Sequence, residues 1–208
     1  MTITRRPSSI PSSVVVEPSR SARLLGLTGI VGGVVLLAAF LIDIAPELNI
    51  VRLVLFLLGA IAVGVGIHRR ETPGSRRLSL AATIPMVVAN AAYLVIVVLG
   101  IDRPQPPDPD PDFRLVEFFA GVALWWTDAV FAFAVLRIGA VSRWGPLALT
   151  VGSVLAFLGI DRLGLVGGPF EAIFHPLALA GVALSGLGWI LLGLGLARRY
   201  VPGSPRPA

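Results

Sequence analysis

The chain has 208 residues, of which 55% are hydrophobic and only 14% charged, and its mean hydropathy is +0.86. A soluble domain carries about 25% charged residues, so this composition excludes a water-facing surface of ordinary size and indicates a polytopic membrane protein. The absence of cysteine excludes disulfides, thiol nucleophiles and cysteine metal sites, and the two histidines cannot form a dense metal site alone. We therefore expect no metal and no cofactor.

All 17 basic residues are arginine, which is typical of a GC-rich genome and favours a bacterial source. The net charge of +5 could point to nucleic acid or to anionic lipid. The distribution of the arginines along the chain favours a role in membrane orientation instead. The lipid bilayer is therefore the expected partner, and nucleic acid is not.

Residues 1–21 are rich in Ser, Pro and Arg, and this composition predicts a disordered tail. The apolar run that follows is longer than the core of a typical signal peptide, so we interpret it as a retained span. Six apolar segments near the length that crosses a bilayer predict an all-α, polytopic bundle of six transmembrane helices over 22–199, with short loops and a tail at 200–208. The predicted spans cover residues 22–43, 51–68, 79–101, 116–138, 144–166 and 172–197, and Pro176 is expected in the first turn of the last helix.

The arginines divide unequally between the two sides of such a bundle. Thirteen fall on the side of the two termini: Arg5, Arg6, Arg20, Arg23, Arg69, Arg70, Arg76, Arg77, Arg137, Arg143, Arg198, Arg199 and Arg206. The other four are Arg52, Arg103, Arg114 and Arg162. Positive charge is retained in the cytoplasm, so we expect both termini to be cytoplasmic and the protein to lie in the bacterial cytoplasmic membrane, the cell membrane, as a multi-pass protein.

The first, third and fifth spans end alike, in AFLID, LGID and FLGID, and their aspartates Asp43, Asp102 and Asp161 are spaced 59 residues apart. One interpretation is a repeat of three helical hairpins, as in transporters built from repeats around a central site. The other is chance similarity among apolar sequences drawn from few residue types. The loop over 102–113, DRPQPPDPDPDF, reads as a stiff spacer or as a weak cation-collecting segment.

Small residues mark the helix faces that should pack closely inside a lipid environment. The first span contains Gly29-x-x-x-Gly33, and on the sixth span Gly181, Ser185, Gly188 and Gly195 share one face. We expect these faces to point into the bundle. They are also the surfaces through which other membrane subunits could associate.

Asp128 is the one acidic residue that belongs to neither side of the membrane. It lies eleven residues after Glu117 and nine before Arg137, so shifting the helix between its charged flanks does not move it out of the apolar core. An ionised carboxylate at the bilayer centre costs about 2.5–3.5 kcal/mol on insertion scales, so Asp128 should face the protein interior. Trp125, three residues earlier, could donate its indole N–H or form a wall of the site.

The third span offers the partners for Asp128, because Thr83, Asn90 and Tyr93 share one stripe of that helix. Asn90 should arrive at the depth of Asp128 on an antiparallel helix, which makes it the best partner, with Tyr93 next. Two interpretations remain open. Asp128 is either a hydrogen-bonded strut between the third and fourth helices, or a proton or cation carrier and the polar anchor of a ligand pocket.

A second set of candidate residues lies at the outer ends of the fifth and sixth spans. These are Asp161, Arg162, Glu171 and His175. Glu171 and His175 share a face if the residues between them are helical. The cluster is either an access site for a substrate or proton, or a set of interfacial ion pairs that closes a short loop.

Motifs for catalysis are missing from the sequence. It contains no Gly-x-Ser-x-Gly, no His-Glu-x-x-His and no phosphate-binding glycine loop, which argues against an enzyme. Two function classes remain. The chain binds or translocates a small solute, proton or cation at a site around Asp128, or it is a structural, accessory or assembly protein of the membrane.

Overall fold

The computed structural model describes residues 20–41, 46–69, 75–101, 111–139, 141–159 and 171–197. Within these ranges the secondary structure is entirely α-helical, in six helices. They are α1 (Arg20–Leu41), α2 (Pro46–Arg69), α3 (Arg76–Ile101), α4 (Pro111–Ile138), α5 (Trp144–Leu158) and α6 (Glu171–Ala197). Five are long and apolar enough to cross a membrane, and α5 is a shorter apolar helix of 15 residues. The predicted all-α membrane bundle is therefore confirmed.

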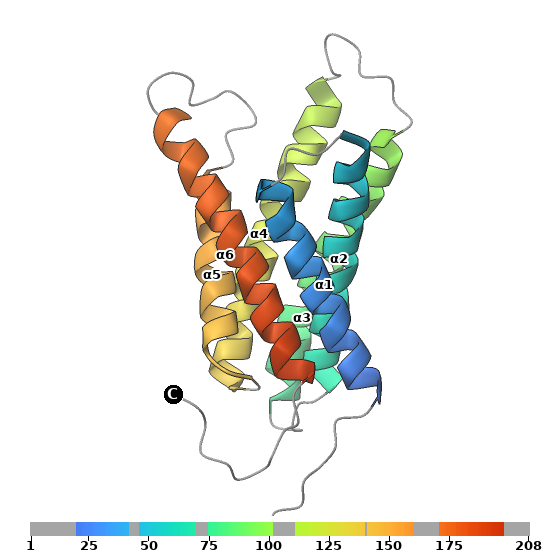
Figure 1. Cartoon of the computed structure of the whole chain (residues 1–208), viewed down its shortest axis with the longest axis vertical. Coiled ribbons are helices and arrows are strands. Elements are labelled where there is room, and N and C mark those ends of the chain that lie inside the picture. The colour runs from blue at the N-terminus through green and yellow to red at the C-terminus, as the bar shows by residue number, and fades with distance from the viewer. Residues whose placement is uncertain are drawn as a thin grey trace, which may run out of the picture.

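The six helices run alongside one another (Figure 1), and their contacts close a ring in chain order. Each helix packs on its neighbours in the sequence, and α1 packs on α6 to close the ring. A weaker contact joins α2 to α6, so α1 lies in the groove between them. Because chain neighbours are antiparallel, α4 and α6 run in the same direction.

The helix ends differ from the predicted spans at several points. Helix α3 begins at Arg76, three residues before the predicted start, and α5 ends at Leu158 with Gly159 as its C-cap, not at residue 166.

The other large differences involve proline. Both α2 and α4 begin several residues earlier than predicted, at Pro46 and Pro111, since proline at the first position gives up only an N–H that has no helical partner. The same rule, applied to Pro176, was wrong. Helix α6 begins at Glu171 and continues through Pro176, which removes one backbone hydrogen bond but leaves the following helix intact. Pro85 lies inside α3 in the same way.

The outer face of the ring is apolar along its length. Large hydrophobic side chains point outward from several helices, including Leu24, Val88, Phe119 and Trp126, which are 57–64% exposed. Water would oppose so much exposed apolar surface, whereas lipid tails cover it at no cost. The outward face therefore indicates contact with the bilayer.

Glycine allows α6 to approach two neighbours closely, on two different faces. Toward α5, a Cβ added to Gly188 would come within 2.6 Å of the backbone nitrogen of Leu149. Toward α1, a Cβ on Gly193 would come within 2.6 Å of the Gly26 carbonyl oxygen, and one on Gly33 equally close to the Gly186 carbonyl. The first face of α6 and the Gly33 face of α1 were predicted, whereas the face of α6 that carries Gly186 and Gly193 was not. Both faces of α6 are occupied by helices of the same chain.

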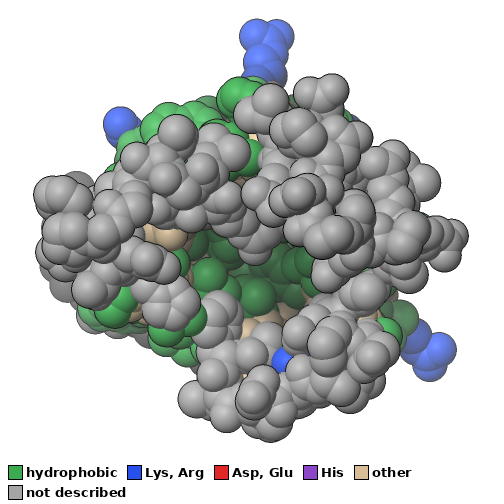
Figure 2. Space-filling view, turned by 90° about the horizontal axis from the view of Figure 1, so that it is seen from above, with side chains coloured by type: hydrophobic (Ala, Val, Ile, Leu, Met, Phe, Trp, Pro, Cys, Tyr) green, Lys and Arg blue, Asp and Glu red, His purple; other side chains and the backbone are tan. Residues whose placement is uncertain are grey.

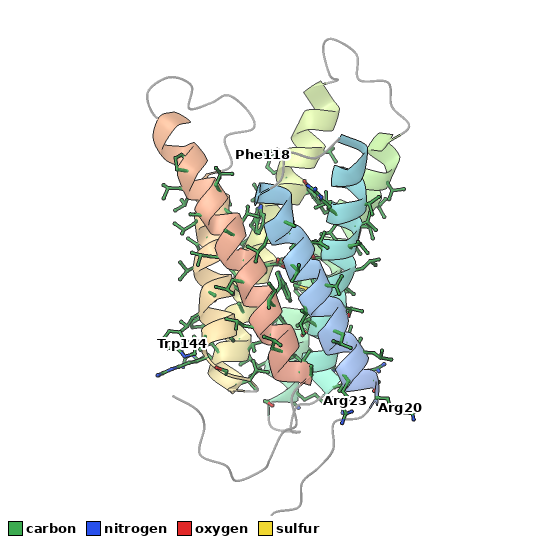
Figure 3. The ribbon with its side chains drawn as sticks, in the orientation of Figure 1. Arg20, Arg23, Phe118 and Trp144 are labelled. Atoms are coloured by element: carbon green, nitrogen blue, oxygen red, sulfur yellow. The ribbon has the colours of Figure 1, made fainter. Side chains whose placement is uncertain are left out.

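Arginines gather at one end of the ring, called here the arginine-rich end. Figure 3 shows Arg20 and Arg23 there, at the start of α1, together with Trp144 at the start of α5. The antiparallel order brings the end of α2, the start of α3 and the end of α4 to the same end. The exposed arginines at these positions are Arg20, Arg23, Arg69, Arg76, Arg77, Arg137 and Arg143.

Candidate functional site

Asp128 lies on the inward face of α4 and its side chain is fully buried. Its Oδ1 accepts a hydrogen bond of 3.0 Å from Nδ2 of Asn90, which is also fully buried on α3. The partner predicted from helix depth is therefore the partner observed. This bond joins two neighbouring helices near the middle of the bundle.

The Asn90 amide is used only in part. Its Nδ2 also donates to the backbone carbonyl of Met86, at 2.9 Å, so both amide hydrogens are engaged. Its Oδ1, however, has no hydrogen-bond partner among the described residues, and neither has Oδ2 of Asp128. The pair therefore satisfies one oxygen of the carboxyl group and leaves one acceptor on each residue open.

A tryptophan from another helix, Trp189 of α6, also lies beside Asp128. The indole N–H of Trp189 interacts with the Asp128 carboxyl group but falls short of hydrogen-bond geometry, so Nε1 counts among the buried atoms without a partner. The Trp189 ring stacks on Phe131 of α4, with centroids 5.9 Å apart and planes inclined by 15°. Trp125 is only partly buried against the core. The stacked pair in the centre of the ring holds Trp189 beside the acid.

Two buried serines lie at nearly the same depth as Asp128. Phe131 of α4 stacks on Trp189 of α6, so these two residues lie at the same depth. Ser185 precedes Trp189 by one helical turn, and Asp128 precedes Phe131 by nearly one turn. Because α4 and α6 run in the same direction, Ser185 and Asp128 lie at similar depths. Ser185 faces α5 at Gly152, which places Ser153 at this level too. Both hydroxyls are fully buried, and neither Oγ has a partner within the described ranges.

These side chains form what we call the polar layer: Asn90, Asp128, Ser153, Ser185 and Trp189. Four consecutive helices, α3 to α6, contribute to it. Buried polar atoms are normally paired, so five side chains that each carry an unpaired atom at one depth need an explanation, such as a bound molecule or ion. The signal missed in the sequence was the pair Ser185 and Trp189, one helical turn apart on α6.

The remaining intramembrane candidates lie away from this layer. Tyr93 is buried one turn beyond Asn90, with Cε2 3.9 Å from the position of a Cβ on Gly121 of α4. Thr83 was expected to belong to the site, but it lies two turns from Asn90 and faces Gly64 of α2. Thr83 and Asn90 do share one stripe of α3, but Thr83 lies two turns along it from Asn90, the residue that contacts Asp128.

The outer cluster falls mostly outside the described residues. Asp161 and Arg162 lie there, as do the aspartates of the repeat and most of the proline-rich loop. Glu171 and His175 belong to the first turns of α6, so their backbone is helical as the shared-face interpretation required. Their side chains are not described.

The end opposite the arginine-rich end is hollowed at its centre. Figure 2 looks onto this end and shows mainly hydrophobic side chains in the hollow, with a basic side chain at its edge. Asp128 and Asn90 are fully buried, so they are closed off from it. The hollow offers a mainly apolar approach to the centre of the bundle from this side.

Charge and donor chemistry limit what the polar layer can hold. Among the described side chains no group of three His, Cys, Asp or Glu residues could hold a metal ion. The buried set that the structure describes includes one acidic residue, Asp128, and no basic one. The layer is therefore suited to a proton, a monovalent cation or a solute with N–H or O–H donors. No family model, curated protein or solved structure matches this chain.

Proposed function

We propose that this multi-pass membrane protein binds a small cation or hydrogen-bond-donating solute at the polar layer around Asp128 and carries it across the bilayer. The observation that supports the proposal is the unpaired Oδ2 of a fully buried carboxyl group. Ionisable residues inside a membrane are expensive to bury and usually mark a pathway or binding site.

Oδ2 of Asp128 has no partner among the described residues. If Oδ2 is ionised, it is a buried charge with no basic side chain among the buried residues described. If Oδ2 carries a proton, that O–H needs an acceptor, and the open Oδ1 of Asn90 is the candidate that the pair itself offers. A buried unsatisfied group costs about 1–3 kcal/mol, which a bound cation or donor-bearing solute relieves.

The alternative, a structural or accessory protein, rests on the Asn90–Asp128 bond itself. A strut between α3 and α4 requires such a bond, and the close glycine contacts of α6 suit a rigid scaffold. A strut does not require open acceptors on both partners, nor unpaired hydroxyls on α5 and α6. For this reason we favour a binding site.

The proposed setting is a bacterial cytoplasmic membrane, with the arginine-rich end in the cytoplasm. Retention of positive charge on the cytoplasmic side supports this orientation. The hollow then opens away from the cytoplasm.

Thermal unfolding of the full-length chain in lipid nanodiscs tests the proposal, with Na⁺, K⁺, ammonium and small primary amines as probes. A ligand at one hundred times its Kd stabilises the folded state by about 2.7 kcal/mol, so at least one probe should raise the Tm of the wild type. Asp128→Asn should abolish that rise. The matched control is Thr127→Val, because the adjacent Thr127 hydroxyl is already bonded to the Leu124 carbonyl at 3.1 Å. An equal rise in Asp128→Asn, or no rise with any probe, would count against the site.

A further inference from the structure

One stripe of α3 carries a line of buried side chains from the arginine-rich end to the polar layer. Its members are Ser79, Thr83, Met86, Asn90 and Tyr93, separated alternately by four and three residues. This spacing keeps them on one helix face. All are polar except Met86, and the stripe meets α2 at one end and Asp128 of α4 near the other.

The first residue of the stripe, Ser79, contacts a histidine of α2. His68, near the end of α2, is half-buried, and its Nδ1 lies 3.1 Å from Oγ of Ser79. The next residue, Arg69, is exposed at the arginine-rich end. The ring nitrogens of imidazole can donate and accept a proton, and a hydroxyl can donate and accept at once. The pair can therefore pass a proton from the surface into the seam between α2 and α3.

One turn further in, Thr83 supplies a second hydroxyl. It is 6% exposed, and its Oγ1 has no hydrogen-bond partner among the described residues. Its methyl group lies near Gly64 of α2, at 3.6 Å from the position of a Cβ there. An unpaired, buried hydroxyl on the line from His68 to Asp128 is suited to hold a water or relay a proton.

Met86 fills the remaining distance. Seven residues separate Thr83 from Asn90, a rise of about 10 Å along the helix, which is too far for a direct transfer. The Met86 side chain occupies this stretch, and its Cε lies against Gly64, where α2 has no side chain. Methionine is unbranched and adaptable, so a change of rotamer would clear space in the seam for water.

We propose that protons reach Asp128 from the arginine-rich end along the α2–α3 seam, through His68, Ser79 and Thr83, with water bridging the gaps on both sides of Thr83 and Met86 closing the inner one. Each step moves one proton in and one out of a hydroxyl or water, so the net result is transfer of a single proton to Asp128. The inference rests on the proposed function, since it makes the proton the cation that competes with the solute for the carboxyl group.

Few charged groups among the described residues lie near this route. At the arginine-rich end, the described arginines nearest in sequence to His68 and Ser79 are Arg69, Arg76 and Arg77, all exposed. Asp128 is faced by Asn90 from α3 and by Trp189 from α6, both uncharged. Ser153, the polar residue of α5 at this depth, is uncharged as well. His68 and Asp128 are thus the titratable groups at the two ends of the route.

Infrared spectroscopy of the full-length chain in lipid bilayers tests this route. The carboxylic acid band of Asp128 is identified by its loss in Asp128→Asn, at a pH where the band is present. The measurement is the rate at which this band shifts when H₂O is replaced by D₂O. Absence of the band at every pH at which the protein is folded would overturn the proposal, because Asp128 would then take up no proton.

Three variants are expected to affect the exchange rate differently: one should slow it, one should accelerate it, and one is the control. Thr83→Val keeps the shape but removes the hydroxyl, and loss of one hydrogen-bonded step should slow the exchange about tenfold. Met86→Ala should accelerate the exchange by opening the seam. Thr150→Val is the control and should leave the rate unchanged, because the Thr150 hydroxyl on α5 lies outside the seam and is bonded to the Pro146 carbonyl at 2.8 Å. Equal rates in wild type, Thr83→Val and Met86→Ala would overturn the route, as would slowing by Thr150→Val as large as that by Thr83→Val.

The nanodisc titrations separate the two proposals. A rise in Tm with a cation that depends on Asp128, without any effect of Thr83→Val on exchange, would retain the binding site and reject the route. Slowed exchange in Thr83→Val, without stabilisation by any probe, would retain the route and reject solute binding.

Discussion

The amide of Asn90 donates to Oδ1 of Asp128 across the α3–α4 contact, 38 positions away in the sequence and 3.0 Å away in space. The same bond leaves Oδ1 of the asparagine and Oδ2 of the aspartate open. One contact thus both ties two helices together and presents two acceptors at the same depth. The predictions below separate its structural part from its binding part.

Replacing Asp128 tests the structural part. Asp128→Asn keeps an acceptor for the Asn90 amide and should unfold close to the wild-type temperature. Asp128→Leu removes that acceptor, and because polar contacts between membrane helices are worth about 0.6–2 kcal/mol, it should lower the free energy of unfolding by that amount. Unfolding in nanodiscs measures both. Asp128→Leu as stable as the wild type would mean that the bond contributes nothing to folding.

Replacing Trp189 separates its indole N–H from its ring. Trp189→Phe keeps an aromatic ring that can stack on Phe131, so the protein should fold with a small loss of stability but a weaker response to any stabilising probe. Trp189→Ala leaves a cavity in the centre of the bundle and should cost about 3–5 kcal/mol. The same unfolding assay applies. An unchanged probe response in Trp189→Phe would remove the indole from the site.

The same substitution, glycine to alanine, at two positions with different surroundings tests the close helix packing. A Cβ on Gly193 would come within 2.6 Å of the Gly26 carbonyl oxygen, so Gly193→Ala should lose about 1–3 kcal/mol through overpacking. A Cβ on Gly121 would meet only Cε2 of Tyr93, at 3.9 Å. Gly121→Ala should therefore be neutral or slightly stabilising, since alanine favours the helix. Equal effects of the two substitutions would contradict the packing account.

Topology is tested by reporter fusions. A fusion at the C-terminus should report a cytoplasmic location and a fusion within 104–113 a location across the membrane, because the arginines gather on the side of the termini. A reporter active only in the opposite compartments would reverse the orientation and, with it, the side from which protons are proposed to reach Asp128.

Sequence alone was sufficient for the number and kind of the helices and for the Asn90–Asp128 contact. Length and hydropathy define a membrane helix without reference to the rest of the fold, because each segment must satisfy its backbone hydrogen bonds within itself. The depth of each residue also followed from the predicted spans: Asn90 and Asp128 lie near the middle of two antiparallel helices, which made Asn90 the best predicted partner of Asp128.

Only the tertiary structure decided which residues complete the layer. Trp125 is near Asp128 along the helix, whereas Trp189 reaches it from α6, one face of which is turned toward Phe131. Thr83 shares a stripe with Asn90, yet its contact is with Gly64 of α2. Rotation of a helix about its own axis is set by its neighbours, and in a chain whose helices are apolar on every side, periodicity does not reveal it.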